Sequence, residues 1–118
     1  MAIPSGGGTE VLKRAGFYAL QSSSGASVLI NGVANHIYTV LSVVICNRSA
    51  ADTTVQMYCQ PDGSGQYELL GDGFANVPAQ ETYVWNDKFV LTGTDHLVLT
   101  NSGSHADIWV SYIDQDWT

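Results

Sequence analysis

The stretch HIYTVLSVVICN, residues 36–47, decides the fold class of this chain. β-Branched and aromatic side chains dominate it, and such a run favours a β-strand. One face of the strand would carry Ile37, Thr39, Leu41, Val43 and Ile45, and the other Tyr38, Val40, Ser42, Val44 and Cys46. Both faces are largely apolar, so we expect a central strand covered on both sides. The second cover is either another subunit or a loop or arm of the same chain.

Further short strands are expected on both sides of this stretch, because runs of Val, Ile, Thr, Tyr and Trp alternate with turn-forming clusters. Asn31-Gly32, for example, is a strong hairpin dipeptide. The expected strands are 13–21, 27–31, 36–47, 53–60, 67–70, 82–91, 97–101 and 106–114. No stretch has a convincing helical period. The pattern predicts an all-β, single-domain antiparallel sandwich, jelly-roll-like, with about seven or eight short strands.

The N-terminal segment MAIPSGGGTEVLKRA has a different character. Pro4 and three glycines stand where a secretory signal needs an apolar run. The segment also lacks the Lys-Ser/Thr pair of a phosphate-binding loop. We therefore expect residues 1–14 to be a flexible, Gly-rich arm and residues 15–118 to be the sandwich. The side chains of the arm expected to contact a partner are Val11, Leu12, Lys13 and Arg14.

The net charge of −7 limits the partners of the chain. Only four residues are basic, so the protein repels phosphate backbones, and neither nucleic acid nor an anionic membrane is an expected partner. Charged residues make up only 13% of the chain, about half the usual share for a soluble domain. This low share fits either a protein with little free surface, as in an assembly, or a surface that is polar but uncharged.

The two cysteines, Cys46 and Cys59, are expected to be free thiols. If the strands that carry them form a hairpin, the two residues are out of register by about 10 Å. That offset exceeds the roughly 7 Å limit on the Cα separation in a disulfide. His36, His96 and His105 form no metal-binding cluster with them, so no metal site is expected.

No arrangement of residues predicts catalysis, and we expect a protein that is no enzyme and has no cofactor. Most acidic residues fall in predicted turns, where Asp is common for structural reasons. Ser104 beside His105 is better explained as part of a loop, because no nucleophile-elbow motif accompanies it. Asp114 and Asp116 offer a weak alternative, a calcium site at the end of a strand.

The aromatic residues leave a second alternative, a sugar-binding surface. They are Tyr18, Tyr38, Tyr58, Tyr67, Tyr83, Trp85, Trp109, Tyr112 and Trp117. Aromatic residues on strands more often belong to the core and to cross-strand pairs. Trp117 stands apart as the penultimate residue, where chains usually fray. It is expected either to dock on its own domain or to be buried by a neighbour.

Four stretches together resemble small virion structural proteins of tailed bacteriophages, particularly those that decorate or cement the capsid. They are MAIPSGGGTEVLKRA, ANHIYTVLSVVICN, TYVWNDKFVLTGTDHLVL and VSYIDQDW. The resemblance implies a mostly β protein that binds the outside of the shell without catalysis. It also implies the major capsid protein and copies of itself, in a homotrimer, as partners.

The resemblance places the protein on the capsid surface of a virion assembled in the host cytoplasm. One alternative is the base or adaptor of a tail fibre or head fibre, with a receptor- or glycan-binding role. A small hydrolase is a third possibility with less support from the residues.

Overall fold

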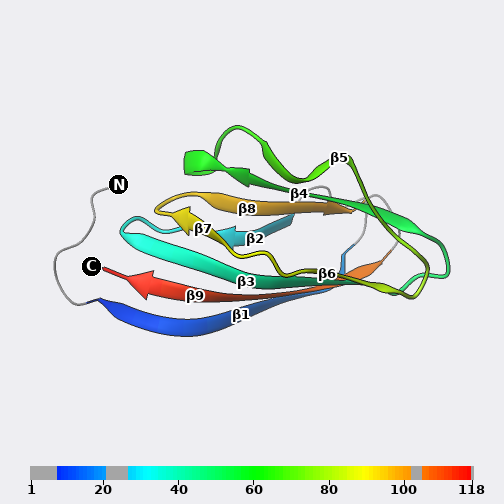
Figure 1. The fold of residues 1–118 in the computed structure, drawn as a ribbon, viewed down its shortest axis with the longest axis horizontal. Coiled ribbons are helices and arrows are strands. Elements are labelled where there is room, and N and C mark those ends of the chain that lie inside the picture. Colours follow the sequence, from blue (N-terminus) through cyan, green and yellow to red (C-terminus); the bar gives the residue numbers. More distant parts are fainter. Residues whose placement is uncertain (1–7, 21–26, 102–104, 118) are drawn as a thin grey trace.

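The computed structural model describes residues 8–20, 27–101 and 105–117, and they form an all-β sandwich (Figure 1). Among these residues, Pro61–Gly63 form a short 3₁₀ turn. The strands are β1 (Thr9–Leu20), β2 (Ser27–Asn31), β3 (His36–Asn47), β4 (Thr53–Gln60), β5 (Tyr67–Val77), β6 (Thr82–Trp85), β7 (Phe89–Thr92), β8 (His96–Asn101) and β9 (Ala106–Asp116). The predicted fold class is confirmed. No helix among the described residues is long and apolar enough to cross a membrane.

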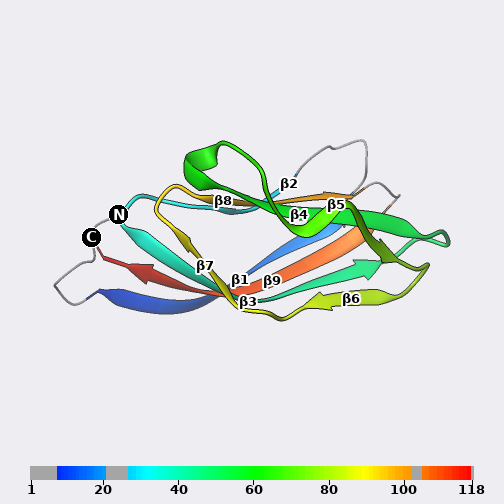
Figure 2. The same cartoon turned by 45° about the horizontal axis from the view of Figure 1, so that its top comes forward.

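The strands form two antiparallel sheets, which lie as two layers in Figures 1 and 2. Sheet A has the order β1-β9-β3-β6, and β7 pairs with the other half of β3; sheet B has the order β2-β8-β4-β5. If β6 and β7 count as one interrupted strand, the pairs are nested along the chain. β1 pairs with β9, β2 with β8, β3 with β6 and β7, and β4 with β5. This nested pairing is the jelly-roll topology.

The core lies between the two sheets and contains side chains from both. Its largest fully buried members are Val40, Val43, Ile45, Ile108 and Val110 of sheet A and Val55, Met57, Leu97 and Leu99 of sheet B, with Leu91 and Val77 at the edges. Alternate residues of β9 point into this layer, as a half-buried strand requires, whereas three consecutive residues of β8, Leu97 to Leu99, are buried.

A β-bulge in β3 corrects the predicted division of this strand into faces. Val40 lies opposite Tyr112 and Ser42 lies opposite Ser111, so Leu41 is an extra residue in β3. A bulge of this kind shifts the inward-facing positions by one. The buried set therefore joins Tyr38 and Val40 of one predicted face to Val43, Ile45 and Asn47 of the other.

The start of β1 corrects the predicted domain boundary. Residues 9–14 pair with β9 in continuous register, from Thr9 opposite Asp116 to Arg14 opposite Ser111. They therefore belong to sheet A, because β9 offers them a full set of main-chain partners. Only the earlier part of the expected arm, residues 1–7, lies outside the described residues.

Two other predicted strands have different ends. The expected strand 82–91 is divided, because Asn86 and its neighbours leave the sheet and Trp85 Nε1 donates to the carbonyl oxygen of Asp87 at 2.9 Å. The expected strand 67–70 continues to Val77. Its pairing jumps from Met57 opposite Leu70 to Val55 opposite Ala75, so the glycine-rich segment forms an irregularity within the strand rather than its end.

The cysteines are free, as predicted, but the premise of that prediction was wrong. Cys46 belongs to β3 in sheet A and Cys59 belongs to β4 in sheet B, so the two strands do not form a hairpin. Both side chains are half-buried. Burial raises the pKa of the Cys59 thiol, with a smaller effect in the same direction from Asp95.

Candidate interaction face on the outer side of sheet A

The outer face of sheet A carries apolar side chains in two rows that run across the strands. The first row joins Gly16, Trp109, Val44 and Val84, which occupy neighbouring positions on β1, β9, β3 and β6. Trp109 is 48% exposed and Val84 is 52% exposed. Exposure of large apolar groups side by side is typical of a surface that contacts another molecule.

The second row lies farther along the same strands. It joins Leu12 of β1, Ile113 of β9, Thr39 of β3 and Val90 of β7. Leu12 is 72% exposed and Val90 is 56% exposed, so this row is open to solvent at both ends. We call the two rows, together with Arg14, which lies between them on β1, the outer face of sheet A.

Gly16 allows the ring of Trp109 to lie against β1. A Cβ atom at residue 16 would lie 3.0 Å from both Cε3 and Cζ3 of Trp109. The guanidinium carbon of Arg14 lies 4.9 Å from the ring centroid, a distance typical of a cation–π contact. The indole is therefore held in place between the glycine and the arginine, while the residue remains 48% exposed.

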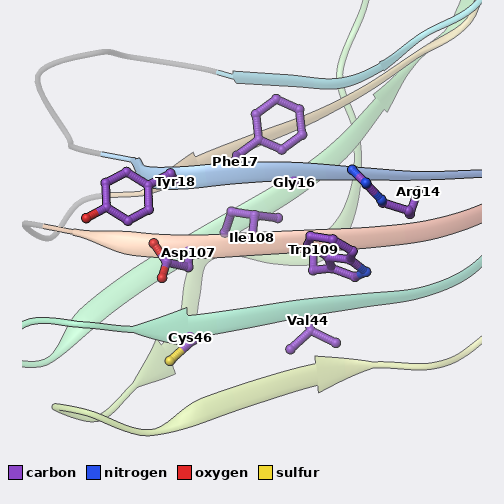
Figure 3. A pocket seen from close by; sticks show the side chains of 9 residues that line it. All are labelled: Arg14, Gly16, Phe17, Tyr18, Val44, Cys46, Asp107, Ile108 and Trp109. Carbon is purple, nitrogen blue, oxygen red and sulfur yellow. The ribbon is translucent and has the colours of Figure 1, made fainter.

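A hollow of about 470 Å³ lies beside this tryptophan. Figure 3 shows its lining, contributed by β1, β9 and β3. At one end the guanidinium of Arg48 lies 4.6 Å from the ring centroid of Tyr18, and Nε of Arg48 lies 3.4 Å from Asp107 Oδ2. Two of the four basic residues of the chain thus lie at this face, although the protein as a whole is strongly acidic.

The residues predicted to contact a partner are divided by the structure. Leu12 and Arg14 belong to the outer face of sheet A, whereas Val11 and Lys13 are on the opposite side of β1. Nζ of Lys13 donates to Asp114 Oδ2 at 2.8 Å, so this lysine has a partner in its own domain.

Trp117 contacts its own domain, one of the two outcomes considered from the sequence. Its backbone N–H donates to the carbonyl oxygen of Asn35 at 3.0 Å. Its ring lies against Gly8, where a Cβ atom would come within 2.7 Å of Cε3. The indole Nε1 is buried, and no described atom accepts its hydrogen.

Sequence reasoning missed Val84 and Val90 as members of an interaction face. It named Val44 only within one apolar face of the stretch 36–47, and Trp109 only within the alternative sugar-binding set. The signal was present, since the second apolar face of the stretch 36–47 suggested a neighbouring subunit. The positions on that face depend on the bulge and on which strands lie beside β3, and neither is visible in a single sequence.

The other sequence-based candidates are placed as follows. Tyr38 and Tyr58 are buried, and Tyr83, Trp85 and Tyr112 pack against the core, so the predicted aromatic set does not form one sugar platform. Ser104 lies outside the described residues. In residues 8–20, 27–101 and 105–117, no group of three or more His, Cys, Asp or Glu side chains has the geometry of a metal site.

Asp114, considered from the sequence as a calcium ligand, is instead the buried centre of a charge cluster in which the side chain of Lys13 is 46% exposed. Asp114 is 5% exposed and accepts from Lys13 Nζ at 2.8 Å, and its Oδ1 lies 2.7 Å from Nδ1 of His36. Nε2 of the same histidine lies 3.5 Å from Asp116 Oδ1. Burial opposes ionisation of Asp114, but the hydrogen bonds from Lys13 and His36 outweigh it and hold the pKa of Asp114 below 3.8. The hydrogen bond to Asp114 raises the pKa of Lys13 above 10.5, against the smaller effect of burial.

This cluster predicts how stability depends on pH. The lowered pKa of Asp114 contributes stability that is present above pH 3.8 and is lost as the pH falls through the pKa in the folded state. The raised pKa of Lys13 contributes stability that is present below pH 10.5 and is lost as the pH rises through its folded-state value. In urea unfolding at a series of pH values, Asp114→Asn should be less stable than the wild type between these limits. The difference should shrink at both extremes, and a difference independent of pH would contradict the assignment.

The sequence matches no known protein family and no curated protein. In fold, the chain is similar to a subunit of Bacillus endospore appendages, described as a novel family of disulfide-linked pili. The TM-score is 0.54 at 10% identity, over 99% of this chain and 96% of that one. At this identity the likeness concerns the fold alone, and it agrees with the β-sandwich described above.

Two viral particles also contain chains with a similar arrangement of strands. A chain of the cyanophage Pam1 capsid aligns with a TM-score of 0.44 and 13% identity, over 98% of this chain and 92% of that one. A chain of infectious bursal disease virus, Gx strain, aligns with a TM-score of 0.47 and 9% identity, over 92% of this chain and 32% of that one. Scores below 0.5 at such identities do not bear on function.

Proposed function

We propose that this chain is a structural protein of a virus particle that binds the outside of the capsid through the outer face of sheet A. It would act as a decoration or cement protein, with the major capsid protein and copies of itself, as a homotrimer, for partners. It would have no catalytic turnover and no cofactor. The exposed apolar rows ending in Leu12, Val84 and Val90 are the observation that carries the proposal.

The physical reason is the composition of this face. A monomeric protein rarely leaves several large apolar side chains exposed side by side, because their burial against a partner gains free energy. Trp109 and Arg14 at its centre are of the residue types that contribute most to protein interfaces. The choice of a capsid as the partner comes from the resemblance of four stretches to virion proteins, and no family model supports that resemblance.

Reconstitution of shells that lack the protein tests the proposal. Added wild-type protein should occupy many equivalent sites and raise the temperature at which the shell breaks open, because binding only the assembled state stabilises it. Val90→Asp should weaken binding by about 10- to 100-fold, as loss of a buried apolar contact of about 1–3 kcal/mol would do. Occupancy is measured on purified particles by gel densitometry.

Val28→Asp is the matched control. Val28 is an exposed valine, 42% accessible, on β2 in the other sheet, so its substitution should leave occupancy unchanged. Equal occupancy of the Val90 variant and the wild type would refute this face as the binding surface. A few copies per particle, located at the tail or at head fibres, would favour the alternative role as a fibre base or adaptor.

A further inference from the structure

In the part of the chain that the structure describes, β1 forms an edge of the sandwich that differs from the other three edges. Among the described strands β1 pairs only with β9, and its register is unbroken from Thr9 to Phe17. The other edges are shorter or interrupted: β2 has five residues and a register shift, β5 has register shifts, and β6 and β7 have four residues each. Short or irregular edges discourage pairing with another chain, and β1 lacks that protection.

We infer that the edges of two β1 strands, from two copies of this chain, pair antiparallel about a two-fold axis through Leu12. Leu12 of one copy lies opposite Leu12 of the other, and sheet A continues from one copy into the next. This contact requires only a second copy and does not depend on the capsid role proposed above. It is separate from the contacts within the proposed homotrimer, because a two-fold contact would join chains of two different trimers.

Charge complementarity fixes the register. In a pair centred on Leu12, Glu10 of each copy lies directly opposite Arg14 of the other, which forms two cross-strand ion pairs. Pairing centred on Arg14 would instead oppose two like charges, and pairing centred on Val11 or Lys13 would leave Glu10 without a basic residue opposite. Within one copy, Glu10 and Arg14 are about 13 Å apart along the strand, so they do not pair with each other. Gln115 Nε2 donates to Glu10 Oε1 at 2.6 Å and Arg14 lies over Trp109, so both side chains would turn from β9 toward the edge to form the proposed ion pairs.

The inward-facing charge on this strand does not oppose the contact. An inward lysine on an edge strand often prevents edge pairing. Here Nζ of Lys13 is bonded to Asp114 at 2.8 Å, so its charge is compensated inside its own domain. In the proposed register Lys13 lies opposite Val11 of the second copy, which introduces no like charge.

The pairing also extends the outer face of sheet A. The second row of this face runs from Val90 through Thr39 and Ile113 to Leu12. In the proposed pair, Leu12 of one copy would lie beside Leu12 of the other, and the row of the second copy would continue in the opposite order. Leu12, now 72% exposed, would lie at the middle of a doubled apolar surface. Two copies would thus present one continuous face instead of two separate ones.

A cysteine placed on the two-fold axis tests the register. In the proposed pair, the Cα atoms of residue 12 lie about 4.5–5.5 Å apart, within the range of a disulfide. Purified Leu12→Cys should therefore form a covalent dimer on mild oxidation. Tyr18→Cys is the control: it is on the same face and strand, but the two copies of residue 18 would be roughly 40 Å apart. Oxidation of the wild-type protein shows whether the native cysteines, Cys46 and Cys59, form cross-links of their own. Melting curves under reducing conditions confirm that each variant is folded.

Charge exchange tests the contact without a cross-link. Glu10→Arg and Arg14→Glu should each weaken dimerisation by about 10-fold, measured by sedimentation, because each opposes like charges across the axis. The double variant restores opposite charges across the axis, so it should regain at least half of the lost dimerisation free energy. It should do so even though it has lost the contacts that both Glu10 and Arg14 make within their own domain. A wild-type protein that is monomeric or only trimeric at high concentration would overturn the inference. Equal cross-linking at residues 12 and 18, or a double variant as weak as the singles, would do the same.

Discussion

Removal of residues 1–14 is expected to lower the free energy of unfolding by several kcal/mol or to prevent folding altogether. The deletion takes away the first half of β1, from Thr9 to Arg14, and leaves the facing part of β9 without a main-chain partner on that side. It also removes Lys13 from the 5%-exposed carboxylate of Asp114. Loss of one partner of a buried charge costs about 1–3 kcal/mol or more, and each lost cross-strand pair adds about 0.2–1 kcal/mol. A domain of this size is stable by only about 5–15 kcal/mol.

The matched control is removal of residues 1–7, which takes away no residue of a described strand. Its urea midpoint should remain close to that of the wild type, while the longer deletion shifts the midpoint or abolishes the transition. Circular dichroism distinguishes an unfolded chain from a weakened one. If both deletions unfold like the wild type, residues 9–14 act as the separate arm expected from the sequence, and their place in sheet A is of little energetic importance.

Lys13→Met separates the loss of backbone pairing between β1 and β9 from the loss of the Lys13–Asp114 ion pair. It keeps all backbone pairs of β1 but leaves Asp114 with His36 as its basic partner. This variant should therefore lose only the share that comes from the charge cluster, about 1–3 kcal/mol.

The strands that sequence reasoning placed most accurately are β2, β3 and β4, whose predicted ends agree with the structure to the residue. Each is bounded by residues with strong turn preferences, such as Asn31-Gly32 before β3 and Pro61 after β4. The start of β1 was misplaced because three glycines precede Thr9 and because Glu10 has a weak strand preference by itself. Thr9 and Glu10 are strand residues because β9 lies alongside, which is a long-range property.

Sequence reasoning predicted that an apolar outer surface exists, but it did not predict which residues form it. The two apolar faces of the stretch 36–47 indicated a covered outer surface, and the structure places half-exposed residues there. The bulge at Leu41 reverses which side chains after it point outward. Nothing in the pattern of apolar and polar residues marks its position. Val84 and Val90 join the face because β6 and β7 lie beside β3, and strand neighbours cannot be deduced from local composition.

Asn47, which sequence reasoning did not single out, provides the second large expected effect. It is fully buried at the end of β3 and joins three segments. Its Nδ2 donates to the carbonyl oxygens of Ala51, Val77 and Pro78 at 2.8, 3.0 and 3.2 Å. Its Oδ1 accepts from the N–H and the hydroxyl of Ser49.

Asn47→Asp should lower the free energy of unfolding by about 3–5 kcal/mol at neutral pH, although the side chain keeps its shape. An ionised carboxylate has no hydrogen to donate, so an oxygen with negative charge would face three carbonyl oxygens without water. The pKa of the new carboxyl should therefore be raised in the folded state, and the loss of stability should become smaller as the pH falls, because the protonated form is neutral and can donate once. Asn86→Asp, in the exposed segment between β6 and β7, is the control and should change stability by less than about 0.5 kcal/mol. Equal losses for the two variants, or a loss at residue 47 that does not shrink in acid, would show that the three carbonyl bonds do not hold this end of the sandwich together.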